Sequence, residues 1–277
     1  MTFSTNGSAS GVPLIDTHIH VDLYEASEQE PLLQSAFANG VDAVVAVSMH
    51  LASSKRNREL AERYAGQVMP AYGFHPEQPL PSEEEVERLL AWMEERAEAG
   101  EAFAVGEVGL PYYMRTEAEA ADMPFDETGY VALLERFIHF AAKHDLPIAL
   151  HAVYEDAAKA LALLEAHGVR RAHFHWFKGS DETITRMIRQ GYHISITPDV
   201  LYEPEIQAIV KRYPLDQIMT ETDGPWPFEG PFAGERTNPG MVQEVAAAIA
   251  RLKEIDAKEA AEQLYRNAVQ FYSLSDR

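Results

Sequence analysis

The sequence predicts a single (β/α)8 TIM barrel, and three observations support that prediction. Strand-like and helix-like segments alternate along the whole chain, which is typical of α/β folds. The length of 277 residues is close to the roughly 250 residues that this barrel usually needs. Histidines and carboxylates stand at the ends of several predicted strands, and a barrel gathers its strand ends around one opening.

The predicted strands are short, mostly continuous runs of apolar residues, as expected when parallel strands are buried on both faces. Pro147 opens the fifth strand, where a missing amide hydrogen costs little. The predicted strands cover residues 14–21, 41–48, 68–76, 102–110, 147–152, 171–177, 192–198 and 217–223.

Helix-like segments fill the spaces between these strands, and several of them end at a glycine, which is a common helix stop. The predicted helices cover residues 28–39, 53–65, 83–99, 128–145, 155–167, 181–190, 203–212, 239–255 and 257–272. The longest segments without a predicted element are 111–127 and 224–238. Both follow strand ends, so we expect both to wall the opening of the barrel.

An open, doubly wound sheet is the alternative architecture for such an alternating chain. It is disfavoured because no Gly-rich phosphate-binding sequence follows the first strand. An open sheet would also spread the polar strand ends apart. We therefore expect residues 13–277 to form one barrel domain and residues 1–12 to form a flexible extension.

Composition limits the possible partners and locations of the protein. The formal net charge of −21 disfavours tight binding of duplex DNA, because the protein's field repels polyanions. The absence of cysteine excludes disulfides, thiolate nucleophiles and Cys-ligated zinc. The sequence contains no apolar run of the roughly 20 residues that span a bilayer, and no signal-peptide pattern. We expect a cytoplasmic protein without a membrane partner.

Seven side chains of metal-ligand type end the predicted strands, and burying so many ionisable groups without a cation would be costly. They are His18, His20, Glu107, His151, His175, Glu221 and Asp223. Because side chains alternate along a strand, His18 and His20 are predicted to share one face. Imidazoles with carboxylates from other strands can hold divalent cations. With its two oxygens, Glu107 is predicted to bridge two cations, and Glu221, deeper than Asp223, to orient a ligand histidine.

Short motifs in a fixed order along the chain indicate a known protein family. They are DTHIH (16–20), GFHP (73–76), GEVGL (106–110), LPIALHA (146–152), HWFKG (175–179), ETDGPW (221–226) and NPG (238–240). The chain resembles the TatD-like metal-dependent hydrolases of the amidohydrolase superfamily over residues 13–272. The resemblance implies one metal site formed by His18, His20, Glu107 and Asp223, and a second formed by Glu107, His151 and His175. It also implies metal-dependent hydrolysis of phosphodiesters, as in deoxyribonucleases.

Three residues depart from the pattern of that family. Pro111 stands where the family commonly has Asp, Val153 where it has Arg, and Trp176 where it has Cys. Loss of an Arg beside the metals removes a natural bidentate clamp for phosphate. The metal ligands are intact, so we expect a phosphodiesterase that acts on a small or single-stranded substrate rather than on long duplex DNA.

We expect Asp223, Glu107 and Glu221 to carry the catalytic roles, with Asp223 accepting a proton from the attacking water. The expected substrate contacts are His75, Lys178, Arg236 and Trp226. The mixed imidazole and carboxylate ligands suit Zn²⁺, Mn²⁺, Fe²⁺, Co²⁺ or Ni²⁺ better than Mg²⁺, although Mg²⁺ is common in assays of the family.

Two other functions fit part of the pattern. The same metal ligands could activate water against an amide, ester or lactone carbonyl, and Val153 together with the acidic composition favours such a neutral substrate. A barrel that only binds a ligand, without catalysis, is the second alternative, which an incomplete set of metal ligands would support.

Overall fold

The computed structural model describes residues 11–274. The expected extension, residues 1–12, lies outside these residues except for its last two. The strands are β1 (Leu14–Ile19), β2 (Val41–Ala46), β3 (Val68–Tyr72), β4 (Ala104–Gly109), β5 (Ile148–His151), β6 (Ala172–Phe174), β7 (His193–Ile196) and β8 (Ile218–Thr220). The α-helices are α1 (Ala26–Ala38), α2 (Leu51–Arg63), α3 (Glu83–Glu98), α4 (Tyr112–Ala120), α5 (Thr128–His144), α6 (Glu155–Ala166), α7 (Asp181–Gln190), α8 (Pro204–Arg212), α9 (Val242–Lys253) and α10 (Ala257–Tyr272).

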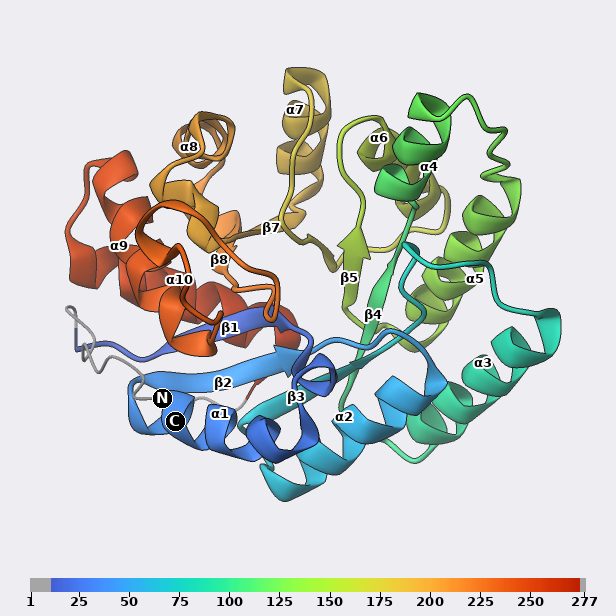
Figure 1. Ribbon diagram of the computed structural model, residues 1–277, viewed down its shortest axis with the longest axis horizontal. Helices are drawn as coiled ribbons and strands as arrows, with labels where there is room; N and C mark the ends of the chain where they lie inside the picture. The colour runs from blue at the N-terminus through green and yellow to red at the C-terminus, as the bar shows by residue number, and fades with distance from the viewer. Residues whose placement is uncertain (1–10, 275–277) are drawn as a thin grey trace. The chain divides into compact units, whose positions relative to one another are not determined.

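The strands form one eight-stranded sheet in which they follow the order of the chain, from β1 to β8. One or two helices follow every strand, and the described strand pairings are parallel (Figure 1). This is the topology of a (β/α)8 TIM barrel, so the predicted fold class is confirmed.

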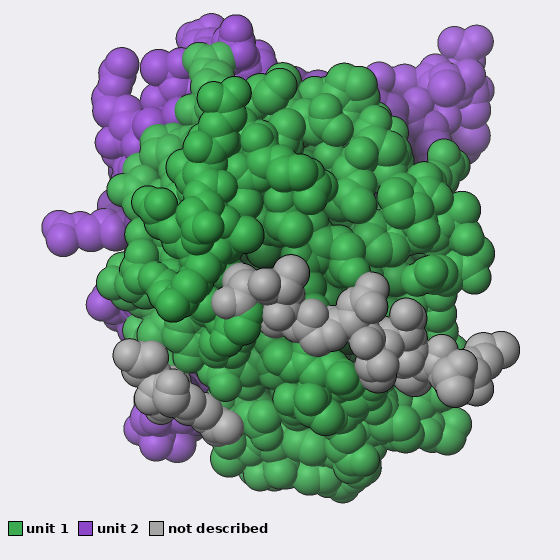
Figure 2. Space-filling model, turned by 90° about the vertical axis from the view of Figure 1, so that its left-hand side faces the viewer, with its two compact units in different colours: residues 1–46, 60–69, 194–277 green, residues 47–59, 70–193 purple. Residues whose placement is uncertain are grey.

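The chain divides into two compact units, which are drawn in separate colours in Figure 2. Unit 1 consists of residues 1–46, 60–69 and 194–277, and unit 2 consists of residues 47–59 and 70–193. The assignment of residues 13–277 to one domain stays a prediction.

In unit 1, α9 and α10 pack against each other and against β1 and β8 (Figure 1). Asn267 of α10 is a buried polar residue in this contact. Its side-chain amide donates hydrogen bonds of 2.7 Å to the carbonyl oxygens of Leu215 and Ile218. These two bonds attach α10 to the start of β8, because buried carbonyls need a donor.

In unit 2, α3 and α7 begin at side-chain caps. The Ser82 side chain accepts from the Glu85 amide while the Glu85 carboxylate accepts from the Ser82 amide, which is a capping box at the start of α3. At the start of α7 the Ser180 side chain accepts from the Thr183 amide, and Gly191 ends this helix in the left-handed conformation. Within residues 11–274, no helix combines the length and the hydropathy that crossing a bilayer requires.

The segment 111–127 contains a helix, α4, where the sequence predicts only an irregular connection. Pro111 offers no side-chain cap, and α4 buries none of its residues, so neither a start signal nor an apolar stripe marks it. Its first amides donate instead to Glu77, with the Tyr113 nitrogen 2.7 Å from Oε1 and the Met114 nitrogen 2.8 Å from Oε2. The cap comes from a distant segment, which local sequence patterns do not reveal.

The strands are shorter at their carboxyl ends than the sequence predicts. Strands β1, β6 and β8 end at Ile19, Phe174 and Thr220, so the functional-looking side chains beyond them lie in the connecting loops. A short 3-10 helix over Pro239–Met241 also precedes α9, where one continuous helix was predicted. At the ends of β1 and β8 the backbone leaves the ladder, as the φ of +49° at Asp223 and the helix-capping position of His20 show.

The attachment of α10 to β8 can be tested with Asn267→Ala. Two buried carbonyl groups would lose their donor, so we expect the free energy of unfolding to fall by about 2 kcal/mol in a urea titration. Gln263→Ala is the matched control, since Gln263 donates to the Asn267 side chain from a more exposed position, accepts from Arg266 and contacts neither carbonyl. Equal stability of Asn267→Ala and the unsubstituted protein would contradict this role.

Candidate metal centre

Unit 1 holds one group of metal-ligand side chains, formed by His18, His20 and Asp223. All three are buried. The Asp223 Oδ1 atom lies 3.5 Å from Nε2 of His18 and 3.7 Å from Nε2 of His20. Backbone hydrogen bonds join the end of β1 to the loop after β8. The Asp223 amide donates to the His18 carbonyl at 2.9 Å, and the His20 amide donates to the Gly224 carbonyl at 2.8 Å. The three side chains therefore converge on one point.

Asp16 holds this group together through hydrogen bonds to residues at or next to the ligands. Its buried carboxylate accepts from the Thr222 amide at 3.0 Å, from the Thr222 hydroxyl at 2.5 Å and from the His18 amide at 3.3 Å. Burial raises the pKa of Asp16 to about 7, although these hydrogen bonds act in the opposite direction. Asp16 thus connects β1 to the residue before Asp223, which holds the left-handed backbone at Asp223 in place.

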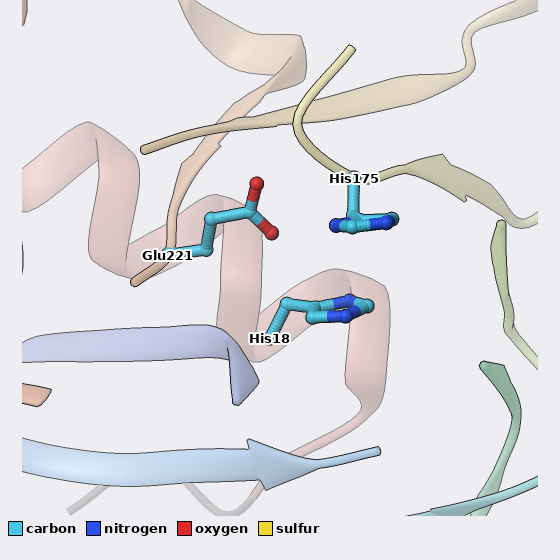
Figure 3. Close-up of side chains that lie close together, drawn as sticks. All are labelled: His18, His175 and Glu221. Atoms are coloured by element: carbon cyan, nitrogen blue, oxygen red, sulfur yellow. The ribbon is translucent and has the colours of Figure 1, made fainter. Parts of the chain in front are cut away.

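Glu221 is fully buried one position past the end of β8. It offers a carboxylate oxygen within 4.8 Å of a ring nitrogen of His18. Figure 3 shows the Glu221 carboxylate and the His18 ring at the ends of β8 and β1. His175, which is also labelled there, belongs to unit 2.

Unit 2 holds a second group, formed by Glu107 of β4, His151 of β5 and His175 just beyond β6. The Glu107 Oε1 atom lies 3.0 Å from Nδ1 of His151 and 2.7 Å from Nε2 of His175. These two ring nitrogens lie 3.2 Å apart. Gly109 permits this approach, because a Cβ atom at that position would stand 1.9 Å from the carbonyl oxygen of His151.

His75, a predicted substrate contact, lies beside this second group. Its Nε2 atom is 3.3 Å from Oε1 of Glu107, and its Nδ1 atom accepts a hydrogen bond from the Glu77 amide at 3.1 Å. When Nδ1 accepts in the neutral ring, the proton resides on Nε2. His75 is thereby set up to donate toward the Glu107 carboxylate.

The chemistry of both groups fits a divalent cation. In a tetrahedral complex with bonds of 2.0–2.1 Å, neighbouring ligand atoms stand about 3.4 Å apart. The distances of 3.5 and 3.7 Å in unit 1 and of 2.7–3.2 Å in unit 2 lie near that spacing. Neutral imidazoles with carboxylates are the donors that transition metals prefer.

His151 is in an unusually negative environment. Burial lowers the pKa of its ring, but the carboxylates of Glu107 and Glu77 outweigh burial and raise the pKa to about 10. Glu77 has a lowered pKa although burial alone would raise it, because His151 and two backbone amides donate to it. Sequence reasoning missed Glu77, since only its position two residues after His75 in GFHPE hinted at the site.

The remaining predicted contact residues have partners of their own. The Lys178 ammonium lies 5.2 Å from the centre of the Trp176 ring. Arg236 is paired with Glu28 and lies 5.2 Å above the ring of Tyr24. Trp226, three residues after Asp223, keeps 52% of its surface exposed.

Two further positions near strand ends, 115 and 153, also bear on phosphate binding. Arg115 donates to Glu155 and to the buried Asp156, both at 2.9 Å. Val153, in the place of the family's Arg, is buried with 2% exposure. Neither position therefore presents a spare guanidinium.

Known proteins are similar to this chain over nearly its whole length. A model of the family described as TatD related DNase matches residues 15–273. An uncharacterised metal-dependent hydrolase of Haemophilus influenzae is 38% identical over 265 residues, which cover 94% of this chain and 100% of that protein. Deoxyribonuclease TATDN3 of Homo sapiens is 30% identical over 270 residues, covering 95% of this chain and 96% of that protein. The crystal structure of YJJV, a TatD homologue from Escherichia coli, matches with a TM-score of 0.79 and 27% identity, covering 95% of this chain and 98% of that one.

The raised pKa of Asp16 predicts a specific pH dependence. The folded state binds this proton up to about pH 7, whereas an unfolded Asp releases it near pH 4, so this carboxyl stabilises the fold at low pH and loses that effect as pH rises between those values. Asp16→Asn removes the effect. In urea titrations with a chelator present, the stability of Asp16→Asn relative to the unsubstituted protein should rise from pH 5 to pH 8, by about 1.4 kcal/mol per pH unit within the window. A difference that stays constant with pH would contradict the assignment.

Proposed function

Because the chain belongs to the TatD-related DNase family of metal-dependent hydrolases, we propose that it cleaves phosphodiester bonds in small or single-stranded substrates with two divalent cations. The observation that carries this proposal is the pair of buried donor groups, each of which fits one cation. The human relative is named a deoxyribonuclease, which supports phosphodiesters as the bond class.

The proposed centre places one ion on His18, His20 and Asp223 and one on His151 and His175, with Glu107 as the bridge. All these residues stand at or just past the carboxyl ends of strands, and those ends surround the active site in (β/α)8 enzymes. Zn²⁺, Mn²⁺, Fe²⁺, Co²⁺ and Ni²⁺ suit the donors best, and Mg²⁺ remains a candidate.

Bound cations would lower the pKa of a water molecule and neutralise charge on phosphate oxygens. Within the protein, Oδ1 of Asp223 is the proposed acceptor of the water's proton. Glu221 would hold His18 in place. The Nε2–H of His75, which faces Glu107 in the structure, would donate to a substrate oxygen once a cation occupies that carboxylate oxygen.

The proposed substrate contacts suit a small anionic substrate. Lys178 would bind one phosphate, and the exposed ring of Trp226 would stack on a base or sugar. Arg236 would bind a second phosphate in competition with Glu28. The net charge of −21 opposes an extended track for duplex DNA. The cytoplasmic location stays a prediction.

Hydrolysis of an amide, ester or lactone is the second candidate. The observation that favours it is Val153, which is buried where the family's Arg would reach a phosphate. A neutral carbonyl substrate does not need that cation.

The bridging role of Glu107 predicts that Glu107→Gln binds at most one ion per chain, whereas the unsubstituted protein binds two. A neutral amide does not offset the repulsion between two cations, so we expect turnover to fall by about 100-fold or more. We also expect added metal to raise the Tm of Glu107→Gln by less than it raises the Tm of the unsubstituted protein. Metal analysis, calorimetric titration and thermal melts measure these effects. Glu101→Gln is the matched control, because Glu101 is also held by hydrogen bonds in unit 2 but accepts from Arg58 and Tyr72. Unchanged metal content and turnover in Glu107→Gln would show that Glu107 is not the bridge.

The substrate class can be tested on the metal-reconstituted enzyme with dinucleotides, a small phosphodiester without a base, neutral esters, lactones and amides. Lys178→Ala should lower kcat/KM for both phosphodiesters by about tenfold, because it removes one charged hydrogen bond. It should leave the neutral esters within about twofold. Trp226→Ala should raise KM for dinucleotides more than for the baseless phosphodiester. Turnover of amides or lactones without any turnover of phosphodiesters would establish the second candidate instead.

A further inference from the structure

Glu77 occupies a place between the start of α4 and the ring of His151. Its Oε1 atom accepts from the Tyr113 amide at 2.7 Å and faces Nε2 of His151 at 3.2 Å. Its Oε2 atom accepts from the Met114 amide at 2.8 Å. One carboxylate thus serves three N–H groups, two from a helix start and one from an imidazole.

The two nitrogens of His151 have different surroundings. Nδ1 faces Oε1 of Glu107 at 3.0 Å and Nε2 of His175 at 3.2 Å, which is the side where the donor group converges. Nε2 faces Glu77 on the other side. A histidine that binds a cation through one nitrogen carries its hydrogen on the other, and a carboxylate at that second nitrogen fixes the tautomer and the ring orientation.

We propose that Glu77 is a positioning residue for the metal centre, which holds His151 with Nε2 protonated and with Nδ1 directed at the cation. The start of α4 holds Glu77 in turn, because its partially positive amides favour a carboxylate. This inference rests on the proposed function. It adds to that function a residue outside the ligand motifs and a helix that supports it.

The contact also joins the ligand to the segment that follows β4. Tyr113 supplies one of the two amides, its ring lies 5.9 Å from the His151 ring, and its side chain is exposed. A displacement of the start of α4 would move Glu77 and therefore loosen His151. The helix that the sequence did not predict is thus part of the support of the site.

Glutamine does not replace Glu77 in this arrangement. An amide side chain has a single acceptor oxygen, whereas Glu77 accepts at both oxygens. In one orientation the NH₂ group of Gln would face the Met114 amide. In the other it would face the Tyr113 amide and the His151 N–H. The substitution keeps the size of the side chain and removes the charge and one acceptor.

The test compares Glu77→Gln with the unsubstituted protein in calorimetric titrations with Zn²⁺ and Co²⁺. We expect the affinity for one of the two ions to fall 10- to 100-fold, as is usual when the carboxylate partner of a ligand histidine is lost, while the other ion binds as before. Long-range nitrogen–proton NMR of the zinc-loaded protein should show a single His151 tautomer, with the proton on Nε2, and a mixture in Glu77→Gln. Glu101→Gln, the matched control, should change neither affinity by more than about twofold.

Circular dichroism and amide hydrogen exchange establish that Glu77→Gln is folded and report on α4. Unchanged metal affinities and an unchanged His151 tautomer, together with faster exchange of the Tyr113 and Met114 amides, would overturn the inference and leave Glu77 as a helix cap alone. If the unsubstituted protein binds no ion at the Glu107 group, both the inference and the proposed function fail. If it binds two ions and Glu77→Gln binds them equally well, only the inference fails.

Discussion

Glu107 imposes the constraint on which the rest of the site depends. Its carboxylate is fully buried, and three imidazole nitrogens, from His75, His151 and His175, lie within 3.3 Å of one oxygen. A charge removed from water in this way is stable only when positive charge or hydrogen-bond donors surround it. The parallel pairing of β4 with β5, and the glycine that lets them approach, serve to bring those groups together.

The same principle applies to the metal-ligand group of unit 1, which two buried carboxylates hold together. Asp16 gathers the loop after β8 by accepting from Thr222, and Asp223 then faces His18 and His20. Such polar groups are a liability in a hydrophobic interior, and each remains there because its partners are fixed by backbone bonds. A change that loosens these loops would therefore also displace the metal-ligand side chains.

Much of this could be predicted from the sequence because the informative features are local. Short apolar runs predict the strands, and glycines that end helices predict the alternation that makes a barrel. The ligand-type residues follow those runs directly, which identifies His18, Glu107 and His151 as candidates. The details that failed depend on contacts between distant segments. The start of α4 depends on Glu77, and the ends of β1 and β8 depend on where the backbone turns to aim His20 and Asp223.

The residue types that carry positive charge can be read from the sequence, but their partners depend on contacts between distant segments. In the sequence, Arg236 is as available for a phosphate as Lys178 is. In the structure, Arg115 is paired with Glu155 and Asp156, and Arg236 is paired with Glu28.

With 44 acidic and 23 basic side chains, a guanidinium in this protein readily meets a carboxylate. An incoming anion would have to displace that carboxylate. Neutralisation of an anionic substrate therefore falls mainly to the cations that the two donor groups would hold, whose charge dominates the local field. A strongly acidic protein can act on a phosphodiester for this reason, and the negative groups that repel long polyanions are of the same kind as those that hold the ions.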